Sequence, residues 1–144
     1  MTQEEKDLLL KDLCTRVPYG VKARCKIPIN QNESKEIVGQ VTSVHYNIDI
    51  VQVGGFDVIV DYNPYFEIKP YLFPLSSMTE EQKNDCPIGE TNLNIINSNI
   101  GYGIIEMPWR LSYLFTDWCN KNHFDYRGLI PMGLANDATG LNIY

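Results

Sequence analysis

The first eighteen residues carry the hydrophobic pattern of one amphipathic helix. Thr2 precedes Glu5 by three positions, the spacing of a capping box in which a hydroxyl and a carboxylate each satisfy a backbone N–H of the first turn. Apolar side chains then recur at helical spacing, at Leu10, Leu13, Cys14 and Val17. Pro18 disfavours the helical conformation before it, so the pattern predicts a helix over residues 3–16.

An alternating pattern follows and predicts strands. From residue 21 to 29 the odd positions are apolar, while Lys or Arg fills positions 22, 24 and 26, which indicates a half-buried strand. The polar stretch 30–35 predicts a hairpin loop, and β-rich runs follow at 37–46, 48–53 and 56–62. The first half of the chain therefore predicts a meander of about four antiparallel strands behind one helix.

Regular strand pairing is expected to end in the middle of the chain. The run from Glu67 to Pro74 contains two prolines, which have no N–H to donate to a ladder. This composition predicts an edge segment or an extended crossing.

Helical signals return in the second half. Thr79 and Gln82 have the spacing of another cap, and they predict a short helix that Pro87 closes. Residues 88–107 are rich in Asn, Ile and Gly and predict at most one more hairpin. From Pro108 a broad apolar stripe predicts a helix packed on the sheet through Leu111, Leu114, Phe115, Trp118 and Cys119. Only a short helical turn is expected after it, around residues 126–130.

These patterns predict one α+β domain over residues 1–144, in which a small curved antiparallel sheet or open barrel of about four to six strands packs with an N-terminal and a C-terminal helix. The composition agrees with this prediction, because 44% apolar and 21% charged residues are ordinary values for a chain with one hydrophobic core.

The charge balance narrows the partners and the compartment. Twelve Lys and Arg against eighteen Asp and Glu give a net charge of −6, which argues against nucleic acid because binding a phosphate backbone requires clustered cations. The start of the chain has no secretory signal, and no apolar run has the length that spans a bilayer. We therefore expect a cytoplasmic protein without a membrane partner.

The four cysteines show no metal-binding or redox spacing. Cys14, Cys25, Cys86 and Cys119 never form C-x-x-C, so we expect no metal site and no cofactor. Three of them, Cys14, Cys25 and Cys119, fall on predicted apolar faces and are expected to be buried thiols that behave as small hydrophobic side chains.

No catalytic motif is present in the sequence: it contains no phosphate-binding loop, no H-E-x-x-H and no G-x-S-x-G. His45 and His123 favour structural roles, the second as a cation near the C-terminus of the last helix. Asp57 and Asp61 share a strand face and are either an acid-base pair or, as we prefer, part of a solvated face. A Cys119 to His123 pair is disfavoured because a buried thiol has a raised pKa.

Aromatic residues are the one unusual feature of the composition. They gather around prolines at Tyr62, Tyr65, Phe66, Tyr71 and Phe73. Such a cluster is a candidate partner-binding patch, because tyrosine offers a large contact area at low entropic cost. The alternative is that these rings close the open side of the small sheet.

Three segments resemble an uncharacterised protein family from gut Bacteroides genomes, prophages and phages. They are LCTRVPYGV from Leu13, EIKPYLFPLSSMTEE from Glu67 and DWCNKNHFDYRGLI from Asp117. The sequence departs from the family pattern at Phe73, Cys119 and Pro131. The resemblance implies a habitat and no activity, since none is attached to the family.

Two hypotheses on function follow. The first is a non-enzymatic binding protein of phage or prophage origin that contacts a host or phage protein through an aromatic surface. The second is an enzyme or a nuclease accessory with a dispersed acid-base site, drawn from His45, Asp57, Asp61 and His123. A concave pocket that gathers these four residues would favour the second hypothesis, and an exposed aromatic patch would favour the first.

The segment from Asp125 to Ile130 predicts a structural role. Asp125 can cap the turn that follows it, while Leu129 and Ile130 can enter the core. A guanidinium among buried groups needs a carboxylate, so Arg127 is expected to form an ion pair with Asp125 or Asp117, the candidates nearest to it along the chain.

Overall fold

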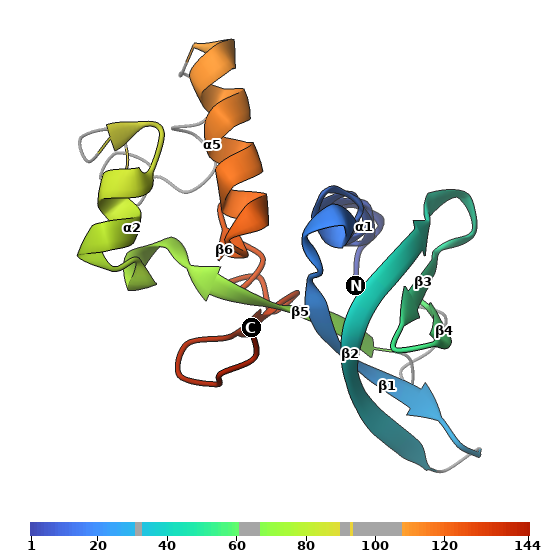
Figure 1. Cartoon of the computed structure of the whole chain (residues 1–144). Coiled ribbons are helices and arrows are strands. Elements are labelled where there is room, and N and C mark those ends of the chain that lie inside the picture. The colour runs from blue at the N-terminus through green and yellow to red at the C-terminus, as the bar shows by residue number, and fades with distance from the viewer. Residues whose placement is uncertain (31–32, 61–66, 90–92, 94–107) are drawn as a thin grey trace.

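The computed structural model describes residues 1–30, 33–60, 67–89, 93 and 108–144, and these residues form an α+β fold around an open sheet (Figure 1). The helices are α1 (Gln3–Arg16), α2 (Glu80–Asp85) and α5 (Trp109–Lys121). The strands are β1 (Lys22–Pro28), β2 (Ser34–His45), β3 (Ile50–Val53), β4 (Phe56–Ile59), β5 (Glu67–Pro74), β6 (Phe124–Asp125) and β7 (Asn136–Asp137). Within these residues the strand order is β4-β3-β2-β1-β5-β6, and β7 also pairs with β5.

The predicted meander is confirmed. Strands β1 to β4 pair in sequence and run antiparallel, as the alternating pattern indicates. The long strand β2 bends through a register shift between Val41 and Ser43, which lets it pair with β1 along one part and with β3 along the other. A close backbone approach accompanies this bend, because a Cβ atom at Gly39 would lie 2.8 Å from the Cα of Gly54. Only glycine fits there without a shift.

The expectation for residues 67–74 is wrong. Strand β5 is an inner strand, antiparallel to β1 over residues 67–70 and parallel to β7 and β6 from Tyr71 onward. Pro70 is the last residue in the β1 register, and the parallel pairs begin one residue later. Pro70 therefore lies where the pairing of β5 with β1 ends and its pairing with β7 begins, and the sheet continues past the proline.

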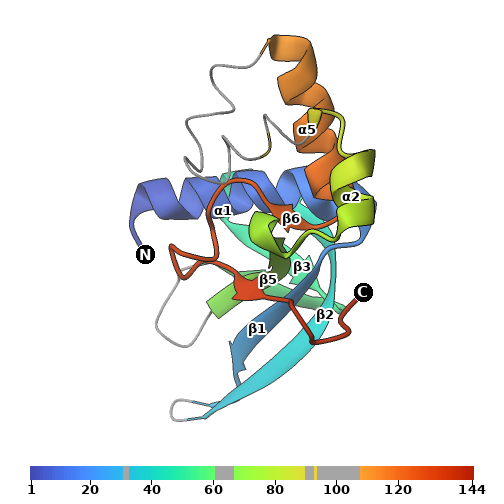
Figure 2. The ribbon, with the colours of Figure 1, turned by 90° about the vertical axis from the view of Figure 1, so that its left-hand side faces the viewer.

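Helix α1 covers one face of the meander (Figure 2). Its predicted capping box between Thr2 and Glu5 is present, and its bounds are those expected from the sequence. Leu9, Leu10 and Leu13 are buried against the strands, whereas Cys14 is exposed, contrary to the expectation from the apolar stripe. The stripe that reaches the core is centred on residues 9 and 13, one position earlier than predicted.

A second apolar cluster joins α5 to the residues that flank α2, such as Met78 and Cys86, and to the segment after α5. Phe115 and Cys119 of α5 are fully buried there beside Phe124 and Tyr126. Trp118, expected to be buried, is half-buried: its ring stacks on Phe124 with centroids 5.4 Å apart, and its indole N–H donates to Asp85. Leu114 is exposed. The helix itself is confirmed, but the covered part of its apolar face is narrower than the sequence suggested.

The C-terminal segment contains turns and the two short strands β6 and β7, and no helical turn over residues 126–130. None of the helices in the described ranges is both long and apolar enough to cross a membrane. The expected hairpin within residues 88–107 falls almost wholly outside the described residues.

Candidate functional site: the cleft between the first and last helices

A buried ion pair lies on the inner side of α1. Asp12 and Arg16 are one helical turn apart, and both have an exposed fraction of 0%. The Arg16 Nε donates to Asp12 Oδ2 over 2.7 Å, and one terminal nitrogen donates to Oδ1 over 3.1 Å. The same guanidinium reaches the carbonyl oxygens of Cys119 and Phe124. The pair therefore links α1 to the end of α5 and to β6.

Arg127 also pairs with Asp12, and with neither acid proposed from the sequence. Its Nε lies 3.2 Å from Asp12 Oδ1. Asp125 instead accepts the backbone N–H groups of Leu129 and Ile130, which confirms its expected role as the cap of the turn. Burial raises the pKa of Asp125, and these two N–H bonds act against that rise. Arg127 thus ties the C-terminal segment to α1 across a long interval of sequence.

Tyr126 lies between the two guanidinium groups. Its ring centroid is 5.5 Å from Arg16 Cζ and 4.8 Å from Arg127 Cζ, within the range of cation–π contacts. Only 3% of Tyr126 is exposed, and its O–H donor has no acceptor among the described residues, while the Asn120 side chain interacts weakly with its oxygen. Burial raises the pKa of Tyr126, so the hydroxyl is protonated at neutral pH. A buried O–H donor without an acceptor is costly, and it calls for an explanation.

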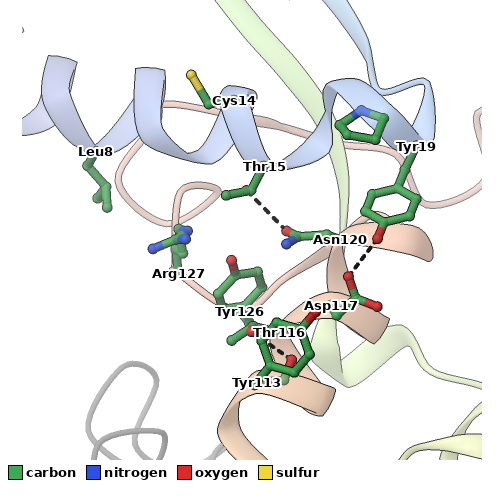
Figure 3. A pocket seen from close by; sticks show the side chains of 11 residues that line it. Leu8, Cys14, Thr15, Tyr19, Tyr113, Thr116, Asp117, Asn120, Tyr126 and Arg127 are labelled. Carbon is green, nitrogen blue, oxygen red and sulfur yellow. Dashed lines mark hydrogen bonds between the residues drawn. The ribbon is translucent and has the colours of Figure 1, made fainter.

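Two of these residues, Tyr126 and Arg127, form the floor of a cleft of about 640 Å³ between α1 and α5 (Figure 3), whereas the fully buried Asp12 and Arg16 do not line it. Leu8 and Thr15 of α1 line one wall, while Tyr113, Asp117 and Asn120 of α5 line the other. Two hydrogen bonds join the walls. Tyr19 donates its hydroxyl to Asp117 Oδ1 over 2.6 Å, and Thr15 donates its hydroxyl to Asn120 Oδ1 over 3.4 Å.

Two aromatic side chains of α5 are exposed on this side of the helix. Tyr113, which lines the cleft, is 65% exposed, and Trp109, one turn earlier on the same face of the helix but outside the cleft lining, is 81% exposed. Exposed large aromatic side chains next to a concave site are typical of binding surfaces.

Within the described residues, the cleft has no pair of groups arranged for acid-base or nucleophilic chemistry. The hydrogen bond to Asp117 raises the pKa of Tyr19, and Asp117 is engaged by the same bond. Partial desolvation raises the pKa of the Cys14 thiol, although the residue is exposed, and this disfavours the thiolate that a nucleophile requires. The chemistry of the cleft is therefore that of contact and hydrogen bonding.

His123 lies outside the cleft and is neutral. It is buried with a positive φ of 59°, and its ring stacks on Tyr144 with centroids 3.8 Å apart. Burial, with a contribution from Arg16, lowers the pKa of His123 to about 4. The expected role as a cation at the end of α5 is therefore wrong, because desolvation outweighs the attraction of the helix terminus. The Cys119 thiol is buried and its pKa is raised, in agreement with the preference against a Cys119 to His123 pair.

The other acid-base candidates do not come together in the described structure. His45 ends β2 and Asp57 lies on β4, separated by strand β3 and by two positions of register. Both are exposed, and Asp61 lies outside the described residues. No group of three or more His, Cys, Asp or Glu side chains that could hold a metal ion occurs where the structure describes the chain.

The aromatic cluster proposed from the sequence is only partly described. Tyr62, Tyr65 and Phe66 lie outside the described residues. The other two, Tyr71 and Phe73, are half-buried on β5: the Tyr71 carbonyl accepts the Tyr144 hydroxyl over 2.7 Å, and the Phe73 ring packs on those of Phe124 and Tyr144. These contacts support the packing interpretation for Tyr71 and Phe73.

Arg127, with Asp117 as one candidate partner, was expected from the sequence only as part of a structural ion pair, and the cleft that both residues line was missed, although one signal was present. Asp12 and Arg16 occur at i and i+4 on the helix face that also carries Leu9 and Leu13. Opposite charges on an apolar stripe indicate a buried pair, which in turn needs surrounding donors and acceptors. By contrast, no local pattern indicates that Tyr113 and Tyr126 lie in one cleft.

Comparisons of this chain with models of protein families, with curated proteins and with solved structures find no match. The function is therefore argued from the chemistry of the cleft.

Proposed function

We propose that this protein is a non-enzymatic binding protein, which holds a segment of a partner protein in the cleft between α1 and α5. The observation that carries the proposal is the combination of two exposed aromatic side chains on α5, Tyr113 in the cleft and Trp109 one turn beyond it, with a concave polar floor. A phage or prophage origin, with a host or phage protein as the partner, is part of the proposal and rests on the family resemblance alone.

The size and composition of the cleft support a segment of polypeptide as the occupant. A volume of about 640 Å³ falls within the range of roughly 300–1,000 Å³ that is typical of ligand sites. Tryptophan and tyrosine are the residues that most often dominate binding energy at protein interfaces, because each buries a large rigid area at little entropic cost. Tyr19, Tyr113 and Trp109 would supply such contacts.

The cleft is also preorganised. The Tyr19 to Asp117 and Thr15 to Asn120 hydrogen bonds fix α1 against α5 at the C-terminal ends of both helices. A site held in shape before binding loses less entropy when its ligand arrives. The alternative of a dispersed acid-base site has no comparable support, because His45, Asp57 and His123 do not share a pocket.

A random peptide display library, selected on the full chain, tests the proposal. Binding is measured from the fluorescence of Trp109 in a Trp118→Phe background, where Trp109 is the only tryptophan. We expect Tyr113→Ala to weaken the selected peptides about thirtyfold, the effect of losing an interface hot spot worth roughly 2 kcal/mol.

Tyr46→Ala is the matched control, because Tyr46 is an exposed tyrosine on the loop between β2 and β3. It should leave the affinity unchanged. The proposal is wrong if selection yields no peptide that depends on Tyr113, or if both substitutions weaken binding equally.

A further inference from the structure

The floor of the cleft offers hydrogen-bond donors, and the acceptors of the neighbouring Asp12 and Asn120 side chains already accept hydrogen bonds. The Asp12 carboxylate accepts three N–H groups, from Arg16 and Arg127. Asn120 Oδ1 accepts the Thr15 hydroxyl, which leaves the amide nitrogen at the other end of that side chain. Unpaired donors remain: the Tyr126 hydroxyl, and the terminal nitrogens of Arg127, which make no hydrogen bond within the described part of the chain.

The Tyr126 hydroxyl faces the ligand space. In Figure 3 it points from the floor toward α1, between Arg127 and Asn120. With 3% of the residue exposed, bulk water reaches this hydroxyl poorly, so the free protein keeps a buried O–H donor without an acceptor. Binding an acceptor atom there would recover a hydrogen bond that the folded chain by itself does not make.

The charge of the floor selects the kind of acceptor. Arg127 lines the cleft with a side chain that is 20% exposed, whereas the Asp12 and Asp125 carboxylates near it are buried and do not line the cleft. Asp117, the acidic residue among those that line the cleft, accepts the Tyr19 hydroxyl. A guanidinium that presents donors to the cleft favours an anionic acceptor over a neutral one.

We infer that the floor of the cleft is a subsite for a carboxylate, supplied by an aspartate or glutamate side chain of the bound segment. One carboxylate oxygen would accept from Tyr126 and the other from Arg127. A lysine or arginine of the partner would meet positive charge and no free acceptor among these floor groups. This inference rests on the proposed function, because it names the residue type that the cleft would recognise.

The test uses the peptides selected above, in matched pairs. Each peptide is compared with a version in which glutamate is replaced by glutamine, or aspartate by asparagine. We expect the acidic version to bind at least about tenfold more tightly, since hydrogen bonds to a charged group contribute more than neutral ones.

Tyr126→Phe tests the protein side of the contact, because it removes one hydroxyl and keeps the ring. It should leave the melting temperature unchanged or raise it, and it should weaken the acidic peptide about tenfold while changing the amide version little. Tyr46→Phe is the matched control: it removes an exposed tyrosine hydroxyl outside the cleft, and it should change neither affinity.

The outcomes separate the two proposals. Peptides that depend on Tyr113 but show no preference for an acidic residue would overturn the carboxylate subsite and leave the binding function standing. Equal binding by Tyr126→Phe and the parent would overturn it as well. A fall of several degrees in the melting temperature of Tyr126→Phe would show that the hydroxyl already has a partner in the free protein, which also contradicts the inference. The absence of any Tyr113-dependent peptide would contradict the proposed function itself.

Discussion

Replacing Asp12 by asparagine should destabilise this protein more than any exposed charge substitution. Asp12 is fully buried and forms ion pairs with two guanidinium groups, through Nε of Arg16 at 2.7 Å and Nε of Arg127 at 3.2 Å. Asparagine is nearly the same size but carries no charge and has one acceptor oxygen instead of two. The substitution therefore leaves Arg16 charged in a site from which water is excluded, without its counter-ion.

The magnitude follows from the burial. Breaking a fully buried ion pair by removing one partner costs roughly 3–5 kcal/mol, against a median of about 0–1 kcal/mol for exposed pairs. For a domain of this size the loss corresponds to a melting temperature lower by about 10–20 °C. Glu80→Gln is the matched control, because Glu80 also pairs within one helix, at 2.6 Å from Lys83, but its side chain is 83% exposed. It should shift the free energy of unfolding by less than about 0.5 kcal/mol.

Urea denaturation followed by circular dichroism measures both variants. A double substitution, Asp12→Leu with Arg16→Met, completes the test, since replacing both members of a buried pair by apolar residues often restores most of the lost stability. If Asp12→Asn unfolds within about 1 kcal/mol of the parent, water solvates Arg16 in solution and the reasoning from burial is refuted.

Two further predictions concern the sheet and the C-terminal segment. Gly39→Ala should cost about 1–3 kcal/mol in urea denaturation, because its Cβ would lie 2.8 Å from the Cα of Gly54 and both backbones must shift; an unchanged midpoint would mean that the turn after β3 yields freely. His123 has a folded pKa of about 4 against 6.5 when unfolded, so the unfolded state binds the proton first, and stability should fall as the pH drops from about 6.5 to about 4. The contribution should be about 2 kcal/mol, discounted for partial solvation of the ring, and His123→Asn should remove this part of the pH dependence; parallel pH profiles for parent and variant would contradict the assignment.

The elements that the sequence predicts well are those specified by neighbouring residues. The bounds of α1 follow from a capping box and a proline, and the four-stranded meander follows from alternation and short turns. The inner position of β5 could not be predicted in the same way. Its parallel pairs with β6 and β7 form only when the segment after α5 packs against it. The preference of proline for edge strands reflects only its missing N–H, and it does not indicate which segments pair with the strand.

The candidate site was harder to predict because its contacts join distant parts of the chain. Proximity in sequence pointed Arg127 to Asp125, but the carboxylate that it meets is Asp12, 115 positions away. Helical periodicity correctly placed Phe115 and Cys119 on one face of α5. It could not show how much of that face the rest of the protein covers, so Leu114 and Trp118 were expected to be more buried than they are.

Asp12 stabilises both the core and the floor of the cleft. The carboxylate that neutralises Arg16 inside the fold also holds Arg127 at the floor of the cleft, and Arg127 lies in turn against the ring of Tyr126. A change at Asp12 would therefore alter stability and binding together, and binding data from such a variant could not separate the two effects. Tyr126→Phe can, because the hydroxyl that it removes donates no hydrogen bond in the folded chain as described. Loss of binding in that variant at unchanged stability must come from a contact that exists only when the cleft is occupied.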